Sequence, residues 1–331
     1  MPSVPEYVPS PGGKIVVVDA LAPASVERLR ALLPPGFTLV SPATRDVAEL
    51  HTLVGDAEFL ISGQLAVDAA LLAAAPKAKL LHKWGVGVDN FDLDAARARG
   101  LTVARTTGSN AVPVAEFTIA LTLALLRNLA AGHALLSKGE WRGLSGARPS
   151  LTVSGKTWGI VGFGAIGQTL ARLLKGFGCR ILYNKTRPLP PEEEAALGVT
   201  YAPLEQILTE ADIVSLHTPM TAQTKGMIDL AALRRMKPTA VLINVARGGV
   251  VAESDLAQAL REKVILGAAM DVFETEPTPS DNPLLGLDNV VVTPHIAALS
   301  GDTFEPTVRR MFANVARVAA GQPIPEGDLV R

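Results

Sequence analysis

The glycine-rich turn Gly162-Phe163-Gly164-Ala165-Ile166-Gly167 restricts the folds open to this sequence more than any other segment does. An apolar run at residues 157–161 leads into it, and residues 165–175 have the spacing of a helix. In such a strand–turn–helix unit the first glycine makes the tight turn, the second lets the backbone approach a pyrophosphate, and the third lets helix and strand pack closely. The start of the helix adds unpaired N–H groups and a partial positive charge. The turn therefore predicts a dinucleotide-binding βαβ unit.

The second strand of this unit should end about 20 residues after the turn. We expect it at residues 179–183, followed by Asn184, Lys185, Thr186 and Arg187. An acidic side chain normally stands here and binds the ribose 2′-hydroxyl of NAD. Asn184 lacks that charge, and the two cations that follow are suited to a 2′-phosphate. We therefore predict a preference for NADP(H) over NAD(H); an ordinary basic surface loop is the alternative.

Short apolar runs alternate with helical segments on both sides of the turn. Strands are expected at residues 14–19, 57–62, 79–82, 101–104, 157–161, 179–183, 213–216, 240–245, 265–270 and 290–293. Helices are expected at residues 24–33, 67–75, 93–99, 165–175 and 302–320, with a short one after Pro190-Pro191. This alternation is typical of α/β proteins with doubly wound parallel sheets. The length of 331 residues indicates two domains.

Residues 111–138 form the longest helical candidate, and leucine and alanine leave it little polar surface. A helix that is apolar on all sides is buried. We therefore expect one long helix that packs between two domains or against a second subunit.

Composition limits the partners and the compartment. The net charge of −1 creates no overall field that would attract nucleic acid or an anionic membrane. The single cysteine, Cys179, excludes an intrachain disulfide and suits a reducing compartment. No apolar stretch reaches the ~18 residues of a membrane span. We expect a cytoplasmic protein with neither a nucleic-acid nor a membrane partner, and the spacing of its histidines predicts no metal site.

Groups with acid–base chemistry follow three of the expected strands. His295 lies just past residues 290–293, and Arg247, followed by two glycines, lies past residues 240–245. The segment 271–277 after the next strand carries several carboxylates, among them Glu276. In open α/β sheets, ligands bind at the carboxyl ends of the strands. The three side chains are therefore candidates for one site.

Together these groups suit the interconversion of a 2-oxo acid and a 2-hydroxy acid. Arg247 would bind the substrate carboxylate and polarise the carbonyl. His295 would donate a proton to the carbonyl oxygen as a hydride reaches the carbon. Glu276, paired with His295, would orient the ring and favour its protonated form. A salt-bridge network between the sheet and its loops is the alternative.

These motifs, in this order, resemble those of the D-2-hydroxyacid dehydrogenases. The resemblance covers about residues 80–300. It is carried by Trp84-Gly-Val-Gly-Val-Asp-Asn90, Asn110-Ala-Val-Pro-Val-Ala-Glu116, Gly162-Phe-Gly-Ala-Ile-Gly167, His217-Thr-Pro219, Asn244-Val-Ala-Arg247-Gly-Gly249, Asp271-Val-Phe-Glu-Thr-Glu276-Pro277 and Thr293-Pro-His295-Ile-Ala297. Asn184 departs from the acidic residue of the NAD-using members.

The resemblance implies the same catalytic trio, Arg247, Glu276 and His295. It implies that the N–H groups of Val86 and Gly87 bind the substrate carboxylate, with Trp84 lining the substrate site. Asp271 should meet the nicotinamide carboxamide. The other cofactor contacts that we expect are Gly162, Gly164, Ala165, Ile166, Gly167, His217, Pro219, Thr224 and Val245.

The family fold is discontinuous. It implies a flavodoxin-like substrate-binding domain of residues 1–109 and 299–331, into which a Rossmann cofactor domain of residues 110–298 is inserted. The apolar helix that begins at Ala111 would then be an inter-domain and dimer element, and the protein a homodimer.

Three functions follow from the resemblance. The first is an NADP(H)-preferring reductase of small 2-oxo acids such as glyoxylate or hydroxypyruvate. The second is an NAD-dependent D-3-phosphoglycerate dehydrogenase, which needs one more cation for the substrate phosphate. Lys83 and Arg105 are the candidates, although each is expected to be a solvated surface charge. The third is a dinucleotide-sensing binding protein without catalysis.

Overall fold

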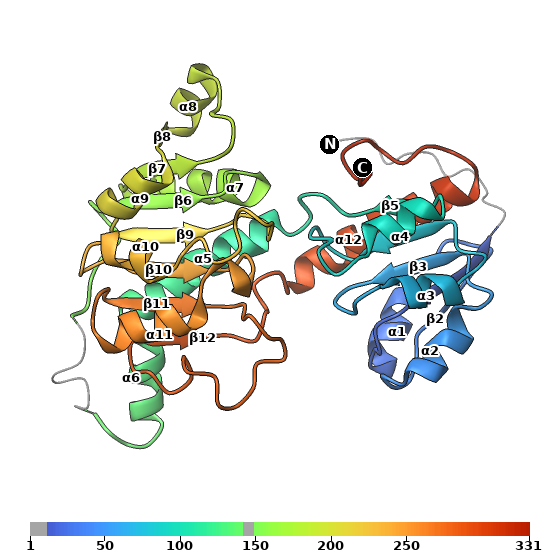
Figure 1. Cartoon of the computed structure of the whole chain (residues 1–331), viewed down its shortest axis with the longest axis horizontal. Helices are drawn as coiled ribbons and strands as arrows, with labels where there is room; N and C mark the ends of the chain where they lie inside the picture. Colours follow the sequence, from blue (N-terminus) through green and yellow to red (C-terminus); the bar gives the residue numbers. More distant parts are fainter. Residues whose placement is uncertain (1–11, 142–148) are drawn as a thin grey trace. The chain divides into compact units, whose positions relative to one another are not determined.

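The computed structural model describes residues 12–141 and 149–331. The chain divides into two compact units: the part up to Asn110 together with Ser300–Arg331, and Ala111–Leu299. Each unit is built around its own parallel sheet (Figure 1). The predicted fold class, α/β with two parallel-sheet units, is confirmed.

The first unit contains a five-stranded parallel sheet in the order β2-β1-β3-β4-β5. The strands are β1 (Gly13–Val17), β2 (Phe37–Val40), β3 (Phe59–Ser62), β4 (Leu80–Lys83) and β5 (Thr102–Ala104). This order, which starts in the interior of the sheet and turns back once, is that of flavodoxin-like proteins.

Both faces of this sheet are covered, because side chains alternate along each strand. Val16 and Leu60 face a core beneath α2 (Val47–Val54), α3 (Ala69–Ala74) and α4 (Leu93–Ala98). Their neighbours Ile15 and Phe59 face the opposite core, which is closed by α1 (Pro23–Arg30) and α12 (Gly301–Ala319). The last helix of the chain thus completes the first unit.

The second unit contains a seven-stranded parallel sheet in the order β12-β11-β10-β9-β6-β7-β8. The strands are β6 (Thr157–Val161), β7 (Arg180–Asn184), β8 (Val199–Tyr201), β9 (Ile213–Leu216), β10 (Val241–Asn244), β11 (Gly267–Met270) and β12 (Val290–Val292). The chain builds outward from β6 to β8 and then returns to β9 on the other side of β6. A ligand crevice is expected at such a switch point.

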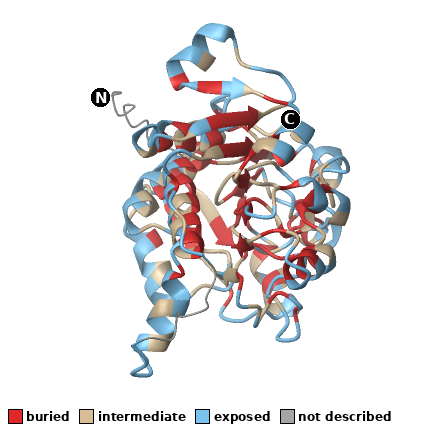
Figure 2. Ribbon diagram, turned by 90° about the vertical axis from the view of Figure 1, so that its left-hand side faces the viewer, coloured by how far each residue is buried: buried red, intermediate tan, exposed pale blue. Residues whose placement is uncertain are grey.

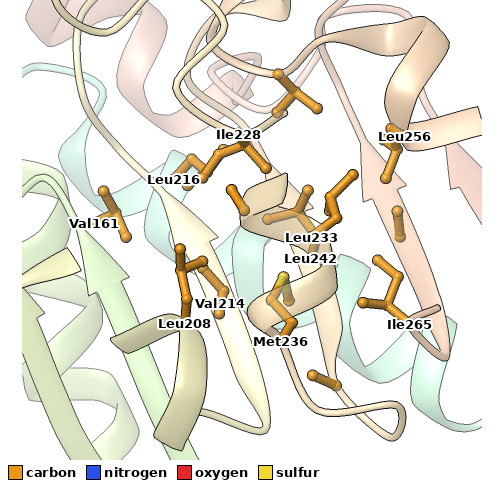
Figure 3. Close-up of a cluster of buried hydrophobic side chains, with 14 of the residues drawn as sticks. Val161, Leu208, Val214, Leu216, Ile228, Leu233, Met236, Leu242, Leu256 and Ile265 are labelled. Carbon is orange, nitrogen blue, oxygen red and sulfur yellow. The ribbon is translucent and has the colours of Figure 1, made fainter. Parts of the chain in front are cut away.

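Two helical layers cover the seven-stranded sheet. One face packs against α9 (Leu204–Glu210), α10 (Leu230–Arg235) and α11 (Glu253–Arg261), and Figure 3 shows the side chains that meet there. The other face packs against α5 (Ala111–Leu126) and α7 (Ala165–Leu174). Figure 2 shows the result, with buried strands between helices whose outer surfaces are exposed. The short helix α8 (Pro191–Leu197) lies between β7 and β8 in the chain.

The prediction of one long helix over residues 111–138 was wrong. The structure has two helices, α5 and α6 (Leu129–Leu136), which meet at a bend of 63°. Asn128 lies between them with a φ of 54°, in the left-handed region that asparagine enters more readily than most residues. Much of α5 is buried, whereas no residue of α6 is. The expected burial therefore applies to the first part of the segment only.

In the described ranges, no single helix has the length and apolar character of a membrane span. The pair α5 and α6 passes that test only when the two bent helices are taken together.

Candidate active site

The glycine-rich turn has the geometry that its sequence predicts. Gly162 follows β6 directly and has a φ of +93°, which favours glycine. A Cβ there would lie 2.5 Å from the carbonyl carbon of His217, and a Cβ at Gly167 would lie 2.6 Å from the oxygen of Gly162. Gly164 is exposed, with open space around it. The turn therefore leaves backbone at the start of α7 accessible, which fits a dinucleotide pyrophosphate.

The expected 2′-phosphate segment begins beside this turn. The N–H of Gly162 donates to the carbonyl of Asn184, 3.0 Å away, at the end of β7. The side-chain amide of Asn184 donates to the carbonyl of Ala202 at 3.0 Å. Thr186 and Arg187 are exposed and Lys185 is half-buried. The structure thus holds the start of the basic segment against the glycine turn.

His217 lies at the switch point between β6 and β9. Its N–H donates to the carbonyl of Val161 at 2.7 Å, and its Nε2 lies 3.0 Å from Oγ of Ser215. The same Ser215 oxygen accepts from the indole N–H of Trp158 at 2.9 Å. Burial lowers the pKa of His217 to about 3, so the ring is neutral. Its buried Nδ1 has no hydrogen-bond partner among the described residues.

The remaining expected cofactor contacts lie in the loops after β9 and β10. Oγ1 of Thr224 donates to the carbonyl of Pro219 at 2.7 Å and closes a turn. Val245 follows β10 directly and is buried. These positions are at the same edge of the sheet as the glycine turn, because all seven strands are parallel.

The three catalytic candidates follow strands whose ends are in register. Asn244, the last residue of β10, pairs with Met270 of β11, and Met270 pairs with Val292 of β12. Beyond these ends, the N–H of Asp271 donates to the carbonyl of Asn244 at 2.9 Å, and the N–H of His295 donates to the carbonyl of Asp271 at 2.8 Å. The segments that carry Arg247, Glu276 and His295 therefore leave the sheet side by side.

His295 and Glu276 are hydrogen-bonded. Nδ1 of His295 lies 2.6 Å from Oε2 of Glu276, and Oε1 accepts from the N–H of Phe273 at 3.0 Å. Burial alone would raise the pKa of Glu276. The hydrogen bonds from His295 and Phe273 and the charges of His295 and Arg247 together have a larger effect, so the pKa of Glu276 is lowered. Glu276 is therefore ionised near neutral pH and accepts from the imidazole.

Asp271 fixes the backbone around His295. Its carboxylate accepts from Oγ1 of Thr293 at 2.6 Å and from the N–H groups of Ile296 and Ala297 at 2.9 and 2.8 Å. These bonds surround His295, whose φ of 53° is unusual for a residue other than glycine. Asp271 is 0% exposed. Its contact with the nicotinamide carboxamide stays a prediction.

The segment of Arg247 packs against the segment of Glu276. A Cβ at Gly248 would lie 1.9 Å from the carbonyl carbon of Phe273, so the two backbones touch there. Nδ2 of Asn244 donates to the carbonyl of Arg247 at 2.9 Å, and the charge of Arg247 contributes to the lowered pKa of Glu276. The structure thus brings all three candidates together at the carboxyl edge of one sheet.

The first unit carries the expected substrate loop, residues 84–90, directly after β4. The ring of Trp84 packs against Phe304 of α12, with 6.0 Å between centroids. Val86 and Gly87 are half-buried. The N–H of Thr106 donates to the carbonyl of Gly85 at 2.9 Å and holds the loop to the end of β5.

The expectation of a solvated Lys83 was wrong. Lys83 is only 8% exposed, and its ammonium group donates to Oδ1 of Asn90 at 2.8 Å and to the carbonyl of Gly63. These two oxygens replace the hydrogen bonds to water that the ammonium group loses when it is buried. Arg105 is half-buried, and its Nε has no hydrogen-bond partner in the described part of the chain. Lys83 supports the loop from within and is not a surface charge.

Two features of this site were not predicted from the sequence. The first is the chain of contacts from Trp158 through Ser215 to His217, in which Trp158 and Ser215 are 57 positions apart in the sequence. The second is the buried Glu253, which accepts from Nδ2 of Asn282 at 2.6 Å and from the N–H of Glu274. Glu253 thereby holds the loop that carries Glu276. No sequence pattern singled out Glu253, because its burial and its two contacts depend on the tertiary structure.

Residues 12–141 and 149–331 contain no group of three or more histidine, cysteine, aspartate or glutamate side chains that could hold a metal ion.

A parallel sheet with a glycine turn at its switch point and a His–Glu pair at its carboxyl edge defines a dinucleotide-dependent α/β enzyme. The model of the D-isomer specific 2-hydroxyacid dehydrogenase NAD binding domain matches residues 119–297. The chain belongs to the D-isomer specific 2-hydroxyacid dehydrogenase family. It is a nicotinamide-dinucleotide-dependent oxidoreductase, as the resemblance of its motifs implied.

Similar proteins support this assignment. A glyoxylate reductase of Korarchaeum cryptofilum is 40% identical over 88% of this chain and 86% of its own length. A D-3-phosphoglycerate dehydrogenase of Mycobacterium tuberculosis is 37% identical over 94% of this chain, but over only 58% of its own length. Among solved structures, the TT0316 protein of Thermus thermophilus has a TM-score of 0.85 at 34% identity and is covered completely, with 96% of this chain. An NAD-dependent formate dehydrogenase of Staphylococcus aureus in complex with NAD has a TM-score of 0.84 at 27% identity, over 96% and 99% of the two chains.

Proposed function

We propose that the protein is an NADP(H)-preferring reductase of small 2-oxo acids, with glyoxylate or hydroxypyruvate as the substrate. The observation that carries this proposal is the His295–Glu276 pair, 2.6 Å apart, beside the Arg247 segment. The similarity to glyoxylate reductases supports it as well.

The three side chains divide the work. Arg247 binds the substrate carboxylate and polarises its carbonyl group. Because Nδ1 of His295 is bonded to Glu276, Nε2 is the atom that gives its proton to the carbonyl oxygen. Glu276 orients the ring and stabilises its protonated form. When bound, the reduced nicotinamide supplies the hydride that reaches the carbonyl carbon, and the product is a 2-hydroxy acid.

The dinucleotide would be held by groups at the carboxyl edge of the seven-stranded sheet. Gly164 and Ala165 are exposed and Ile166 is half-buried, and the N–H groups at this start of α7 suit the pyrophosphate. The predicted contacts of His217, Pro219, Thr224, Val245 and Asp271 with the rest of the cofactor remain part of this proposal.

The preference for NADP(H) rests on Lys185 and Arg187, with Thr186 between them. No acidic side chain occupies residues 184–187, so nothing in this segment repels a 2′-phosphate. The ratio of kcat/KM for NADPH to that for NADH tests the preference. We expect a ratio well above one, which falls when Lys185 and Arg187 are both replaced by alanine; a clear preference for NADH would refute it.

Membership of this family also supports a proposal for the roles of the two domains and for the oligomeric state. We propose residues 1–109 and 299–331 as the substrate-binding domain and 110–298 as the cofactor domain. In the former, the N–H groups of Val86 and Gly87 would bind the substrate carboxylate, and Trp84 would line its site. We further propose a cytoplasmic homodimer.

The experiment that tests the proposed function is a panel of 2-oxo acids with both cofactors. Glyoxylate, hydroxypyruvate and pyruvate should each be tested for oxidation of NADPH and of NADH. We expect the highest kcat/KM with glyoxylate or hydroxypyruvate and NADPH. Turnover of none of these acids would remove the proposal.

Oxidation of D-3-phosphoglycerate is the second candidate, because a dehydrogenase of that name matches 94% of this chain. Lys83, one of the two cations considered for the substrate phosphate, already donates to Asn90 and Gly63. We therefore expect little activity with D-3-phosphoglycerate and NAD, and efficient turnover of this pair would reverse the order of the two candidates.

A further inference from the structure

Tyr183 is a buried residue that has no role in the proposed reaction. It lies in β7, one position before Asn184, and is 0% exposed. Its hydroxyl donates to Oε1 of Glu194 at 2.6 Å and accepts from the N–H of Leu189 at 2.7 Å. A buried hydroxyl with two hydrogen bonds fixes both partners, so Tyr183 ties the segment after β7 to helix α8.

The ring of Tyr183 also contacts the glycine-rich turn. Its centroid lies 4.3 Å from that of Phe163, which stands between Gly162 and Gly164. On the other side, the ring meets Tyr201 of β8 at 5.7 Å, edge to face. Figure 1 shows β7, β8 and α8 together at one end of the seven-stranded sheet. One side chain therefore joins the pyrophosphate turn to the basic segment.

The basic segment is held at both ends. At its start, Asn184 bonds through its carbonyl to Gly162 and through its amide to Ala202. At its end, the N–H of Leu189 bonds to Tyr183. Only a few residues lie between these points, and they include Lys185 and Arg187. A short segment anchored in this way loses less conformational freedom when it binds a ligand than a free loop does.

We propose that Tyr183 and Glu194 are positioning residues that set the discrimination between a phosphorylated and an unphosphorylated adenosine ribose. The inference rests on the proposed NADP(H) preference and adds a cause for it. The two residues act through Lys185 and Arg187, which they hold in the place where a 2′-phosphate is recognised. Neither of them is proposed to touch the cofactor.

The protonation of this pair is consistent with the inference. Burial, with the hydrogen bond to Glu194, raises the pKa of Tyr183 to about 12. The phenol therefore keeps its proton under ordinary assay conditions and remains the donor to Glu194.

The test compares the dissociation constants of 2′,5′-ADP and 5′-AMP, measured by titration calorimetry on the whole protein. The variants are Tyr183→Phe, Glu194→Ala and Glu194→Gln. The matched controls are Tyr201→Phe, the neighbouring tyrosine, and Glu193→Ala, an exposed glutamate one position earlier. Circular dichroism confirms that each variant is folded, and the NADPH to NADH ratio of kcat/KM gives a second readout.

We expect Tyr183→Phe and Glu194→Ala to lower the preference for 2′,5′-ADP about tenfold, roughly the worth of one hydrogen bond to a charged group. Glu194→Gln keeps an acceptor oxygen and should therefore retain most of the wild-type preference for 2′,5′-ADP. Both controls should match the wild type. The direction in which the affinity for 2′,5′-ADP changes in Glu194→Ala separates two roles of this glutamate. A glutamate that acted only through its charge would repel the phosphate, and its removal would strengthen binding.

The outcomes separate the two proposals. If the wild type binds both nucleotides equally, the NADP(H) preference is wrong and this inference is wrong with it. If the wild type prefers 2′,5′-ADP and loses that preference in the Lys185→Ala, Arg187→Ala double variant but not in Tyr183→Phe or Glu194→Ala, only this inference is overturned. Should Tyr183→Phe fail to fold, the two Glu194 variants decide alone.

Discussion

At the scale of single residues, Asp271 shows how one buried carboxylate shapes the site. It accepts hydrogen bonds from Thr293, Ile296 and Ala297, on both sides of His295. Bonds of this kind to a charged group contribute about 1.5–3 kcal/mol each. The conformation of His295 therefore depends on a residue that is itself fully buried.

We predict that Asp271→Asn lowers the free energy of unfolding by about 2–3 kcal/mol, because an amide offers one acceptor oxygen where the carboxylate offers two. Urea unfolding measures the change, and kcat should fall as His295 loses its orientation. Asp288→Asn, at an exposed aspartate before β12, is the control. Wild-type stability in the Asp271 variant would contradict the positioning role.

At the scale of elements, the close approach of two loops brings the catalytic groups together. Gly248 follows Arg247 and lies against the backbone of Phe273 and Glu274. The loops after β10 and β11 therefore have little freedom to move apart.

We expect Gly248→Ala to separate these loops, because its Cβ would stand 1.9 Å from the carbonyl carbon of Phe273. Overpacking of this kind costs about 1–3 kcal/mol or more, and the thermal midpoint should fall accordingly. Gly176→Ala, where a Cβ would meet open space, should change neither stability nor activity. An active Gly248→Ala enzyme of normal stability would show that the loops can adjust.

The sequence predicted those elements that have clear periodicity or special residues. The expected strand at residues 157–161 agrees with β6, and the catalytic candidates could be grouped because parallel strands end at one edge of a sheet. The short elements β2, β8, α2, α9, α10 and α11 were not anticipated, since a few residues give little periodic signal. The break at Asn128 and the burial of Lys83 depend on backbone conformation and tertiary contacts that composition does not encode.

At the scale of the whole molecule, α6 presents an apolar surface. Leu129 and Leu136, seven positions and about two helical turns apart, are 65% and 56% exposed, and Trp141 is 83% exposed. Exposed apolar side chains on one face of a helix, such as Leu129 and Leu136, commonly mark a contact with another protein. A second copy of this chain is the partner that the proposed homodimer requires.

We expect Leu129→Glu combined with Leu136→Glu to convert a dimer into a monomer, because the surface would then carry charges that a contact must desolvate. Size-exclusion chromatography with light scattering measures the mass. Val47→Glu, at an exposed valine of α2, should leave the mass unchanged. A double variant that remains dimeric would place the interface elsewhere.

Stability should also depend on pH through His82 in the first unit. Its Nδ1 lies 2.8 Å from the carbonyl of Lys83 and its Nε2 lies 3.1 Å from Nδ2 of Asn314, with Asp328 and Arg310 nearby. Burial lowers the pKa of His82 to about 4 from its ordinary 6.5. The unfolded chain therefore takes up a proton at a higher pH than the folded chain does.

This stabilisation is fully present above pH 6.5 and is lost as the pH falls through 4. Its size is about 3 kcal/mol, from 1.36 kcal/mol for each unit of pKa difference. Urea unfolding between pH 7 and pH 4 should show a shallower decline for His82→Gln than for the wild type. His51→Gln, at a half-buried histidine of α2, should follow the wild type, and equal slopes for all three proteins would contradict this role of His82.

The most direct test of His295 as the proton donor is a rapid-mixing measurement of hydride transfer from NADPH to glyoxylate in the wild type and in His295→Ala. We predict that the rate falls about 10²–10⁴-fold, the usual contribution of a general acid. The dissociation constant of NADPH, measured by fluorescence titration, should stay close to that of the wild type. A His295→Ala protein that transfers hydride at the full rate would contradict the assignment of this histidine as the proton donor.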